Sequence, residues 1–248
     1  MWLRPQVPTT VDPNIIAPLR GQVYHLRGPG RAGKSMRTVA EHWLMDVLAD
    51  GQPVHWIDGA CRIDPSRFLA ALHRRGVDAE ACLARLYLSR GFTLHQLDTQ
   101  IARIANEITI TRSPLVVVDG LLAMHQDDAI KPFESRILLR RHMAFLRQIA
   151  AQHHASVLVI TADQGSNVLE QERIAHVARH AQNHLQGFWK GSERQRRLHL
   201  KHLRTHIEGM WGEMEDTGQL RWNIQASPVK DECLQLNTEA LRLRYEAR

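Results

Sequence analysis

The chain has 248 residues, 44% of them hydrophobic, which is enough to bury the core of one α/β domain spanning residues 1–248. Its formal net charge of +6 is compatible with an acidic partner such as nucleic acid, and equally with an ordinary basic surface. The three cysteines include no C-x-x-C pair, which argues against a disulfide framework and a cysteine zinc site. There is no apolar run of about 18 residues, and charges and prolines lie near the start, which argues against a membrane span and an export signal. We therefore expect a cytoplasmic protein.

A glycine-rich loop lies between the first predicted strand and the first predicted helix. Residues 23–26 predict the strand, and apolar residues recur at helical spacing after the loop until residues 50–51 (Asp-Gly) end the run. Residues 28–35 read Gly-Pro-Gly-Arg-Ala-Gly-Lys-Ser and fit the G-x-x-x-x-G-K-[ST] pattern at every specified position. Such a loop brings backbone N–H groups close to a polyphosphate, so it predicts a site for a nucleoside triphosphate.

Each residue type in this loop has an expected role. Lys34 is placed to reach the β- and γ-phosphates, and the hydroxyl of Ser35 is placed to ligate Mg²⁺. The helix that opens at Lys34 directs the positive end of its dipole at the anion. The residues expected to contact the nucleotide are Gly28, Pro29, Gly30, Arg31, Ala32, Gly33, Lys34, Ser35 and Met36.

Alternating strands and helices follow the loop. We expect a strand over residues 53–58, a helix over 67–74 and a strand over 84–88. Thr93 and Gln96 form a capping box at the start of the next helix. Five apolar residues then recur on one face, which favours core packing over a partner surface: Leu94, Leu97, Ile101, Ile104 and Ile108.

The strand predicted over residues 115–119 is apolar throughout and ends in a carboxylate. This pattern is typical of a strand buried on both faces of a parallel sheet. Ligands bind at the carboxyl ends of such strands, so Asp119 is expected to hold the water shell of Mg²⁺ opposite Ser35. A helix from Glu134 and a strand over residues 156–161 come next. The polar residues at the end of that strand either sense the γ-phosphate or form a loop: Thr161, Asp163 and Gln164.

Together these residues resemble the ATPase core of the RecA/RadA recombinase family. The likeness includes a lead-in segment at residues 9–21, the stretch 54–68, the strand 115–120 and the segment 134–164. It implies a RecA-like P-loop NTPase, α/β, with a mostly parallel central sheet, helices on both faces and antiparallel strands at the C-terminal end. It also implies ATP and Mg²⁺ as cofactors, single-stranded DNA as a partner, and self-association or a related ATPase subunit. Within one domain, residues 1–20 would be the lead-in, 21–165 the nucleotide-binding core and 166–248 a variant C-terminal region.

The chain departs from the family pattern at the catalytic carboxylate. The family's water-polarising glutamate would fall two residues after Asp58, where this sequence has Ala60, and Gly120 follows Asp119. A methyl group cannot accept a proton or orient water. Hydrolysis is then either slow or supported by Asp58, and the expected catalytic set is Lys34, Asp119, Asp58 and Gln164. The family's N-terminal helix-hairpin-helix domain and its Phe-x-x-Ala linking motif are also not recognisable here.

Two basic stretches follow the core. A polar helix is expected over residues 165–195, with His176, His180 and His184 on one face, which suits a solvated or phosphate-facing stripe better than a metal site. The segment 194–204 predicts an amphipathic strand whose charged face can remain solvated, track a nucleic-acid backbone near Trp189, or supply an arginine finger to a neighbouring subunit. The candidate nucleic-acid contacts are Arg194, Arg196, Arg197, Lys201 and Arg204.

The sequence therefore favours an ATP-binding, DNA-associated protein of the recombinase-paralogue kind, in which the nucleotide controls assembly during recombination or repair. A second hypothesis is an adaptor that hydrolyses ATP weakly or not at all and uses it structurally to hold a partner ATPase; Ala60 favours this one. A small-molecule kinase is the least supported, because neither an arginine-rich lid nor an acceptor-binding carboxylate is evident.

Overall fold

The computed structural model describes residues 17–192, 196–213 and 220–226, with side chains described up to residue 211. The chain divides into two compact units, one formed by Pro18–Gly187 and the other by the residues before and after it. None of the helices in these described ranges is long and apolar enough to cross a membrane.

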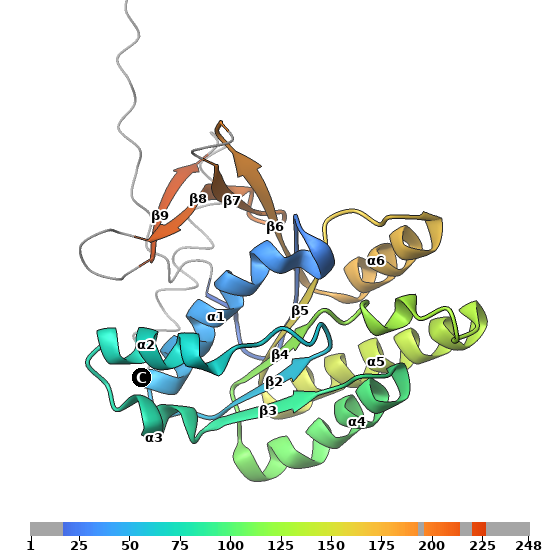
Figure 1. Cartoon of the computed structure of the whole chain (residues 1–248), viewed down its shortest axis with the longest axis horizontal. Coiled ribbons are helices and arrows are strands. Elements are labelled where there is room, and N and C mark those ends of the chain that lie inside the picture. Colours follow the sequence, from blue (N-terminus) through green and yellow to red (C-terminus); the bar gives the residue numbers. More distant parts are fainter. Residues whose placement is uncertain (1–16, 193–195, 214–219, 227–248) are drawn as a thin grey trace, which may run out of the picture. The chain divides into compact units, whose positions relative to one another are not determined.

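The larger unit is built on parallel strands that alternate with helices (Figure 1). Its strands lie in the order β3-β2-β4-β5-β1-β6, and every pair with a described register is parallel. The strands are β1 (Val23–Gly28), β2 (Val54–Asp58), β3 (Leu86–Arg90), β4 (Leu115–Asp119), β5 (Ser156–Ala162) and β6 (Asn183–Lys190). The helices are α1 (Lys34–Ala49), α2 (Pro65–Arg74), α3 (Ala79–Leu83), α4 (Leu94–Thr111), α5 (Pro132–His153) and α6 (Val168–His180), with short 3-10 turns η2 (Arg31–Gly33) and η3 (Met124–Gln126).

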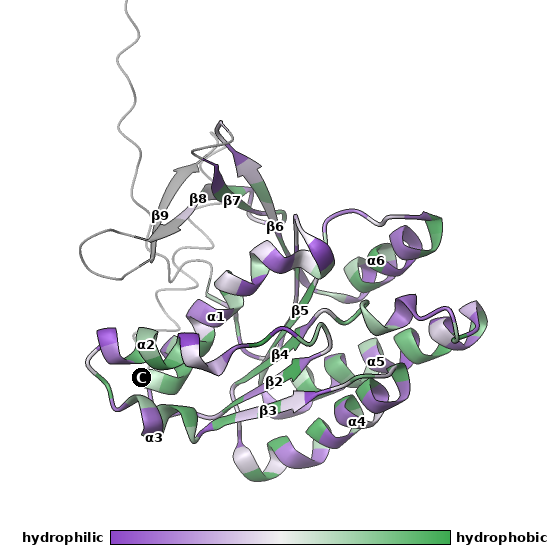
Figure 2. Cartoon of the chain, viewed as in Figure 1, coloured by the Kyte–Doolittle hydropathy of each residue, from purple (hydrophilic) through white to green (hydrophobic). Residues whose placement is uncertain are grey.

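Helices cover both faces of this sheet. Helices α1, α2 and α3 pack together on one side, and α4, α5 and α6 on the other (Figure 1). Strands β2 and β4 are buried along their whole length. The apolar run that precedes Asp119 predicts this for β4 (Figure 2), whereas β2 also buries the polar side chain of His55. Because side chains alternate along a strand, Val116 and Val118 join the core shared with α4 and α5.

Most predicted elements are confirmed with small shifts at their ends, but the helix expected over residues 165–195 forms only over Val168–His180, and strand β6 occupies part of the remainder. Thr93 caps α4, since its side chain accepts a hydrogen bond from the Gln96 N–H at 3.2 Å. The expected apolar stripe of this helix is buried throughout: Leu94, Leu97, Ile101, Ile104 and Ile108. The strand expected over 84–88 forms over 86–90 instead, because residues 79–83 adopt an extra short helix that Asp78 caps.

The single helical face expected for three histidines is wrong. Helix α6 ends at His180, so only His176 and His180 share it, and their rings lie 4.1 Å apart. His184 belongs to β6, where it is paired in register with His25 of β1. Among the described residues, no group of three His, Cys, Asp or Glu side chains converges to hold a metal ion.

The smaller unit contains antiparallel strands, as the sequence predicts for the C-terminal end. Strand β7 (Arg197–His202) pairs with β8 (Ile207–Glu213), and β8 pairs with β9 (Leu220–Ala226). In β7, Leu198 and Leu200 are buried while Arg197 is exposed, so the expected amphipathic strand is confirmed.

The larger unit also buries titratable histidines. Burial and the neighbouring His184 lower the pKa of His25 to about 3. Burial and His142 likewise lower the pKa of His125 to about 3, and burial lowers the pKa of His142 to about 4 against the opposing effect of Asp98. These rings therefore fold in their neutral form.

The unfolded chain binds protons at these histidines near pH 6.5, whereas the folded protein does not until the pH approaches 4 to 3. We expect the contribution of these histidines to the free energy of unfolding to be at its maximum above pH 6.5. It should fall as the pH drops below this value, by up to about 1.4 kcal/mol per pH unit for each histidine. Urea unfolding between pH 7 and 4 measures this slope. His125→Gln should flatten it and exposed His73→Gln should not; equal slopes in all three proteins would contradict the expectation.

Candidate nucleotide-binding site

The loop between β1 and α1 adopts backbone conformations that glycine favours. Gly30 has φ 92° and Gly33 has φ 74°, and Ala32 lies in the left-handed region with φ 49°. Helix α1 begins directly after Gly33, with Lys34 exposed at its first turn. A 16-residue helix thus begins directly after the loop, as the sequence predicts, and a helix start of this kind can bind an anion.

Gly33 is required by packing as well as by its φ angle. A Cβ atom at this position would lie 2.0 Å from the carbonyl oxygen of Thr161 in β5, far closer than any real contact. At Gly28 a Cβ atom would lie 2.6 Å from Cγ of Met36 and 2.8 Å from Oγ of Ser35. These close approaches fix the loop against β5 and α1.

The loop is closed by its own backbone hydrogen bonds. The N–H of Gly33 donates to the carbonyl of Gly30 at 3.0 Å, and the N–H of Ser35 donates to that of Pro29 at 3.2 Å. The hydroxyl oxygen of Ser35 is buried and has no hydrogen-bond partner among the described residues. A buried oxygen of this kind, beside a carboxylate-bearing strand end, fits a role as a ligand of Mg²⁺.

Asp119 is fully buried at the end of β4 and faces a positive charge. The guanidinium of Arg62 contacts both of its carboxylate oxygens, with Nε donating to Oδ2 at 3.1 Å and Nη2 to Oδ1. Burial raises the pKa of Asp119, and the hydrogen bonds and charge of Arg62 oppose this effect. Asp119 stands where the sequence predicts, but its present partner is an arginine that the sequence analysis did not single out.

Asp58, also fully buried, lies opposite Asp119 in the register of β2 and β4. One carboxylate oxygen accepts from the N–H of Arg62 at 3.0 Å. The other accepts from the N–H of Ile63 at 2.9 Å and from Nε of Arg90 at 3.1 Å. Asp58 therefore holds the segment after β2 in place.

A second buried ion pair supports the same segment from α1. Arg37 and Glu41 are one helical turn apart and both nearly inaccessible, with Nε of Arg37 2.7 Å from Oε1 of Glu41. The guanidinium of Arg37 also donates to the carbonyl oxygen of Arg62. The backbone on both sides of the Arg62 side chain is thus fixed by charged groups.

Neither usual position of a catalytic carboxylate carries one. Ala60 and Gly120 lie side by side, so close that a Cβ atom on Gly120 would be 2.6 Å from that of Ala60. The N–H of Gly59 donates to the carbonyl of Asp119 at 2.9 Å, which ties the ends of the two strands together. The two positions that lack a carboxylate are therefore tightly packed, and neither offers a side chain that could activate water.

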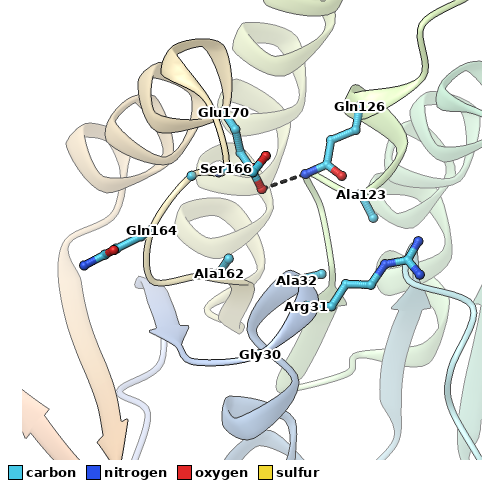
Figure 3. A pocket seen from close by; sticks show the side chains of 10 residues that line it. Gly30, Arg31, Ala32, Ala123, Gln126, Ala162, Gln164, Ser166 and Glu170 are labelled. Carbon is cyan, nitrogen blue, oxygen red and sulfur yellow. Dashed lines mark hydrogen bonds between the residues drawn. The ribbon is translucent and has the colours of Figure 1, made fainter.

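A pocket of about 290 Å³ adjoins the loop on its β5 side. Its walls come from the loop, from η3 and the residue before it, and from the stretch that runs from the last residue of β5 to the first turn of α6: Gly30, Arg31, Ala32, Ala123, Gln126, Ala162, Gln164, Gly165, Ser166 and Glu170. The side chains of Gln126 and Glu170 meet at 2.6 Å, while those of Arg31 and Gln164 extend in opposite directions (Figure 3). Gln164 thus borders a space next to the loop.

The two other polar residues expected to face the nucleotide, one near the end of β5 and one directly after it, contact other side chains of the unit. The hydroxyl of Thr161 lies 2.7 Å from Nε2 of His25 and is buried. Asp163 pairs with Arg27 at 3.5 Å and accepts a hydrogen bond from Gln186 at 3.0 Å. The structure therefore brings Gln164, rather than these two residues, to the wall of the pocket.

The candidate nucleic-acid residues lie in the smaller unit. Arg196, Arg197 and Arg204 are exposed and Lys201 is half-buried, with its Nζ 4.0 Å from Glu208; Arg194 lies outside the described residues. The side chain of Trp189 is 47% exposed. On the same unit, Phe188 stacks against His199 with ring centroids 5.8 Å apart. A basic and partly aromatic surface is thus present around β7.

Comparison with known protein families gives a match to the Rad51 family over residues 31–203, which is more than half of the chain. The chain belongs to the Rad51 family. The predicted likeness to RecA/RadA recombinases is confirmed, and the RecA-like α/β fold agrees with it. Membership implies a recombinase-related protein that binds nucleotide. No curated protein sequence matches the chain significantly.

Two residues in the Rad51 region were not found by sequence reasoning. Arg62 lies in an irregular segment, and nothing in the sequence shows that it faces Asp119. Glu170 lines the pocket, and its Oε2 accepts from both the N–H and the hydroxyl of Ser166 at 2.6 Å. A signal for Glu170 did exist, because Asn167 and Glu170 have the spacing of a helix-capping box.

Gly33→Ala tests how tightly the Rad51 loop is packed, with Gly51→Ala as a matched control. Both glycines have nearly the same φ, 74° and 75°, but a Cβ atom at Gly51 meets nothing within 4 Å. The control should cost about 1–2 kcal/mol from backbone strain alone. Gly33→Ala should cost clearly more in urea unfolding, because the loop or β5 must move. Equal losses would show that the loop is not held against Thr161.

Proposed function

We propose that this Rad51-family chain binds ATP with Mg²⁺ and acts as a recombinase paralogue whose nucleotide state controls assembly on single-stranded DNA. The observation that carries the proposal is the loop at residues 28–35, in which a phosphate-loop sequence lies against β5 and the buried Ser35 hydroxyl has no hydrogen-bond partner within the described part of the chain. The family match supports the same assignment.

The roles within the site follow from position. Backbone N–H groups of the loop would hold the phosphates. Those of Gly33 and Ser35 donate to the carbonyls of Gly30 and Pro29, so they would exchange these hydrogen bonds for bonds to the anion. Lys34, exposed at the start of α1, would pair with the terminal phosphates. Ser35 and Asp119 would hold Mg²⁺, which neutralises phosphate charge when bound.

We propose slow hydrolysis. Ala60 and Gly120 offer no group that can orient water, and the carboxylate of Asp58 already accepts three hydrogen bonds from protein donors. Gln164 is the remaining candidate for positioning the attacking water, because it lines the pocket beside the loop.

The proposed DNA contact lies on the smaller unit. Arg197 and Lys201 share the face of β7 opposite its buried leucines, and Arg196 and Arg204 flank the strand. Guanidinium and ammonium groups bind phosphates without reading sequence, while an exposed Trp189 offers a face on which a base can stack. This combination suits single-stranded DNA.

An adaptor that uses ATP structurally is the second candidate, and the pairing of Ala60 with Gly120 favours it. It would bind ATP equally well and hold a partner ATPase. ATP turnover measured with and without single-stranded DNA separates the two candidates, because clear stimulation by DNA would eliminate the adaptor.

Lys34→Ala tests nucleotide binding. Removing the ammonium group should weaken ATP affinity at least tenfold in calorimetry with Mg²⁺ present, a loss of about 1.4 kcal/mol. Lys131→Ala, which removes an exposed lysine before α5, is the matched control and should bind as the wild type does. Absence of ATP binding in the wild-type protein would refute the proposed function.

Salt-dependent binding tests the DNA surface. The affinity for an oligothymidylate should fall steeply with salt, and each of Arg196→Ala, Arg197→Ala and Arg204→Ala should reduce the slope of log K against log salt by about 0.7. Arg103→Ala, on the exposed face of α4, should leave the slope unchanged. A slope near zero in the wild-type protein, or equal affinity with and without ATP, would contradict nucleotide-controlled DNA binding.

A further inference from the structure

The Arg62 guanidinium links Asp119 to the phosphate loop. Besides its two contacts with the carboxylate, its Nη1 donates to the carbonyl oxygen of Arg31 at 2.6 Å and its Nη2 to that of Ala32 at 3.0 Å. All the acceptors belong to groups expected to take part in nucleotide binding. The side chain is 17% exposed, so one side of it remains open to solvent.

Hydrogen bonds from neighbouring elements hold the backbone of Arg62 in place. The N–H of Arg62 is held by Asp58 and its carbonyl oxygen by Arg37, which is itself paired with Glu41. The backbone is thus anchored on both sides, and the side chain reaches Asp119 from a fixed starting point. Among the described residues, no other cation is paired with Asp119.

An ionised carboxylate at zero exposure is strongly unfavourable unless a positive group or hydrogen-bond donors face it. For Asp119, which is fully buried, the guanidinium of Arg62 supplies both. Both carboxylate oxygens are engaged by a planar, two-pronged guanidinium, a geometry that lysine cannot reproduce. Water ligands of Mg²⁺ would have to donate to the same two oxygens.

We propose that Arg62 and Mg²⁺ compete for Asp119, so that Arg62 occupies the carboxylate in the nucleotide-free protein and must release it when a Mg²⁺–nucleotide complex binds. This inference rests on the proposed nucleotide binding. Release also frees the carbonyl oxygens of Arg31 and Ala32, so the loop and the carboxylate change together. The partly exposed guanidinium can turn to solvent or to a phosphate oxygen while its backbone stays anchored.

Titration of Mg²⁺ at a fixed concentration of ATP tests the competition. The Mg²⁺ concentration that gives half-maximal binding should fall several-fold in Arg62→Gln, and less in Arg62→Lys, which keeps a charge near Asp119. Arg75→Gln, which removes the partner of Asp46 elsewhere in the unit, should leave this midpoint unchanged. An unchanged or higher midpoint in Arg62→Gln would overturn the proposal.

A measurement without nucleotide separates failure of this inference from failure of nucleotide binding. In thermal unfolding, Arg62→Gln, Asp119→Asn and the double variant form a cycle in which the double variant should lose less Tm than the two single losses summed. Additive losses would show that the two side chains are not coupled and would overturn the inference even where ATP binds. Coupled losses in a protein that binds no ATP at any Mg²⁺ concentration would refute the proposed function and leave only a structural ion pair.

If Arg62→Gln does not fold, the wild-type protein still decides the matter. The Nε–H resonance of Arg62 in ¹⁵N-labelled protein should shift on addition of ATP with Mg²⁺, and much less on addition of ATP with a chelator. An identical shift under both conditions would contradict displacement by the metal ion.

Discussion

The parallel register of the central strands is the constraint on which the site depends. Asp58 lies opposite Asp119, Asp119 opposite Ile160, and Arg27 opposite Thr161, so β2, β4, β5 and β1 end at nearly the same level. The phosphate loop leaves β1 at this level and is pressed against the Thr161 carbonyl at Gly33. A shift of one residue between β2 and β4 would place Asp58 and Asp119 on opposite faces of the sheet.

Bringing strand ends together also concentrates buried charge, and the chain balances each charge locally. Asp119 pairs with Arg62, Asp58 with Arg90, and Arg37 with Glu41. Such pairs contribute little net stability compared with well-packed apolar groups in the same place. Removing one partner is nevertheless costly, because the other charge is then buried without a partner. Their clear effect here is positional, since all three pairs converge on the segment of residues 58–63. This segment includes Ala60, the position at which the sequence comparison leads us to expect the family's catalytic glutamate.

The two units carry different proposed binding surfaces, one for nucleotide and one for DNA. The groups that we propose to bind nucleotide lie in Pro18–Gly187, and the basic strand lies in the other unit, which includes Phe188 and the residues after it. The Rad51 match extends from the loop into β7 and so includes both. Within the smaller unit, Glu208 pairs with Lys190 and lies near Lys201, which lowers the positive charge of one part of the surface. Among the residues whose side chains the structure describes there, Arg196, Arg197 and Arg204 are exposed and form no ion pair with an acidic residue.

The sequence by itself determined the elements and the loop, because their signals are local. The pattern of residues 28–35, the uninterrupted apolar run before Asp119 and the helical stripe from Leu94 to Ile108 each depend on neighbours a few residues away. Only the tertiary structure decided what Asp119 touches, because Arg62 approaches it across 57 positions of the sequence from a segment without periodicity. It also separated His184 from His176 and His180, since spacing alone does not show where a helix ends and a strand begins. Local propensity is encoded in adjacent residues, whereas contacts between charges at strand ends exist only once the register of the sheet has formed.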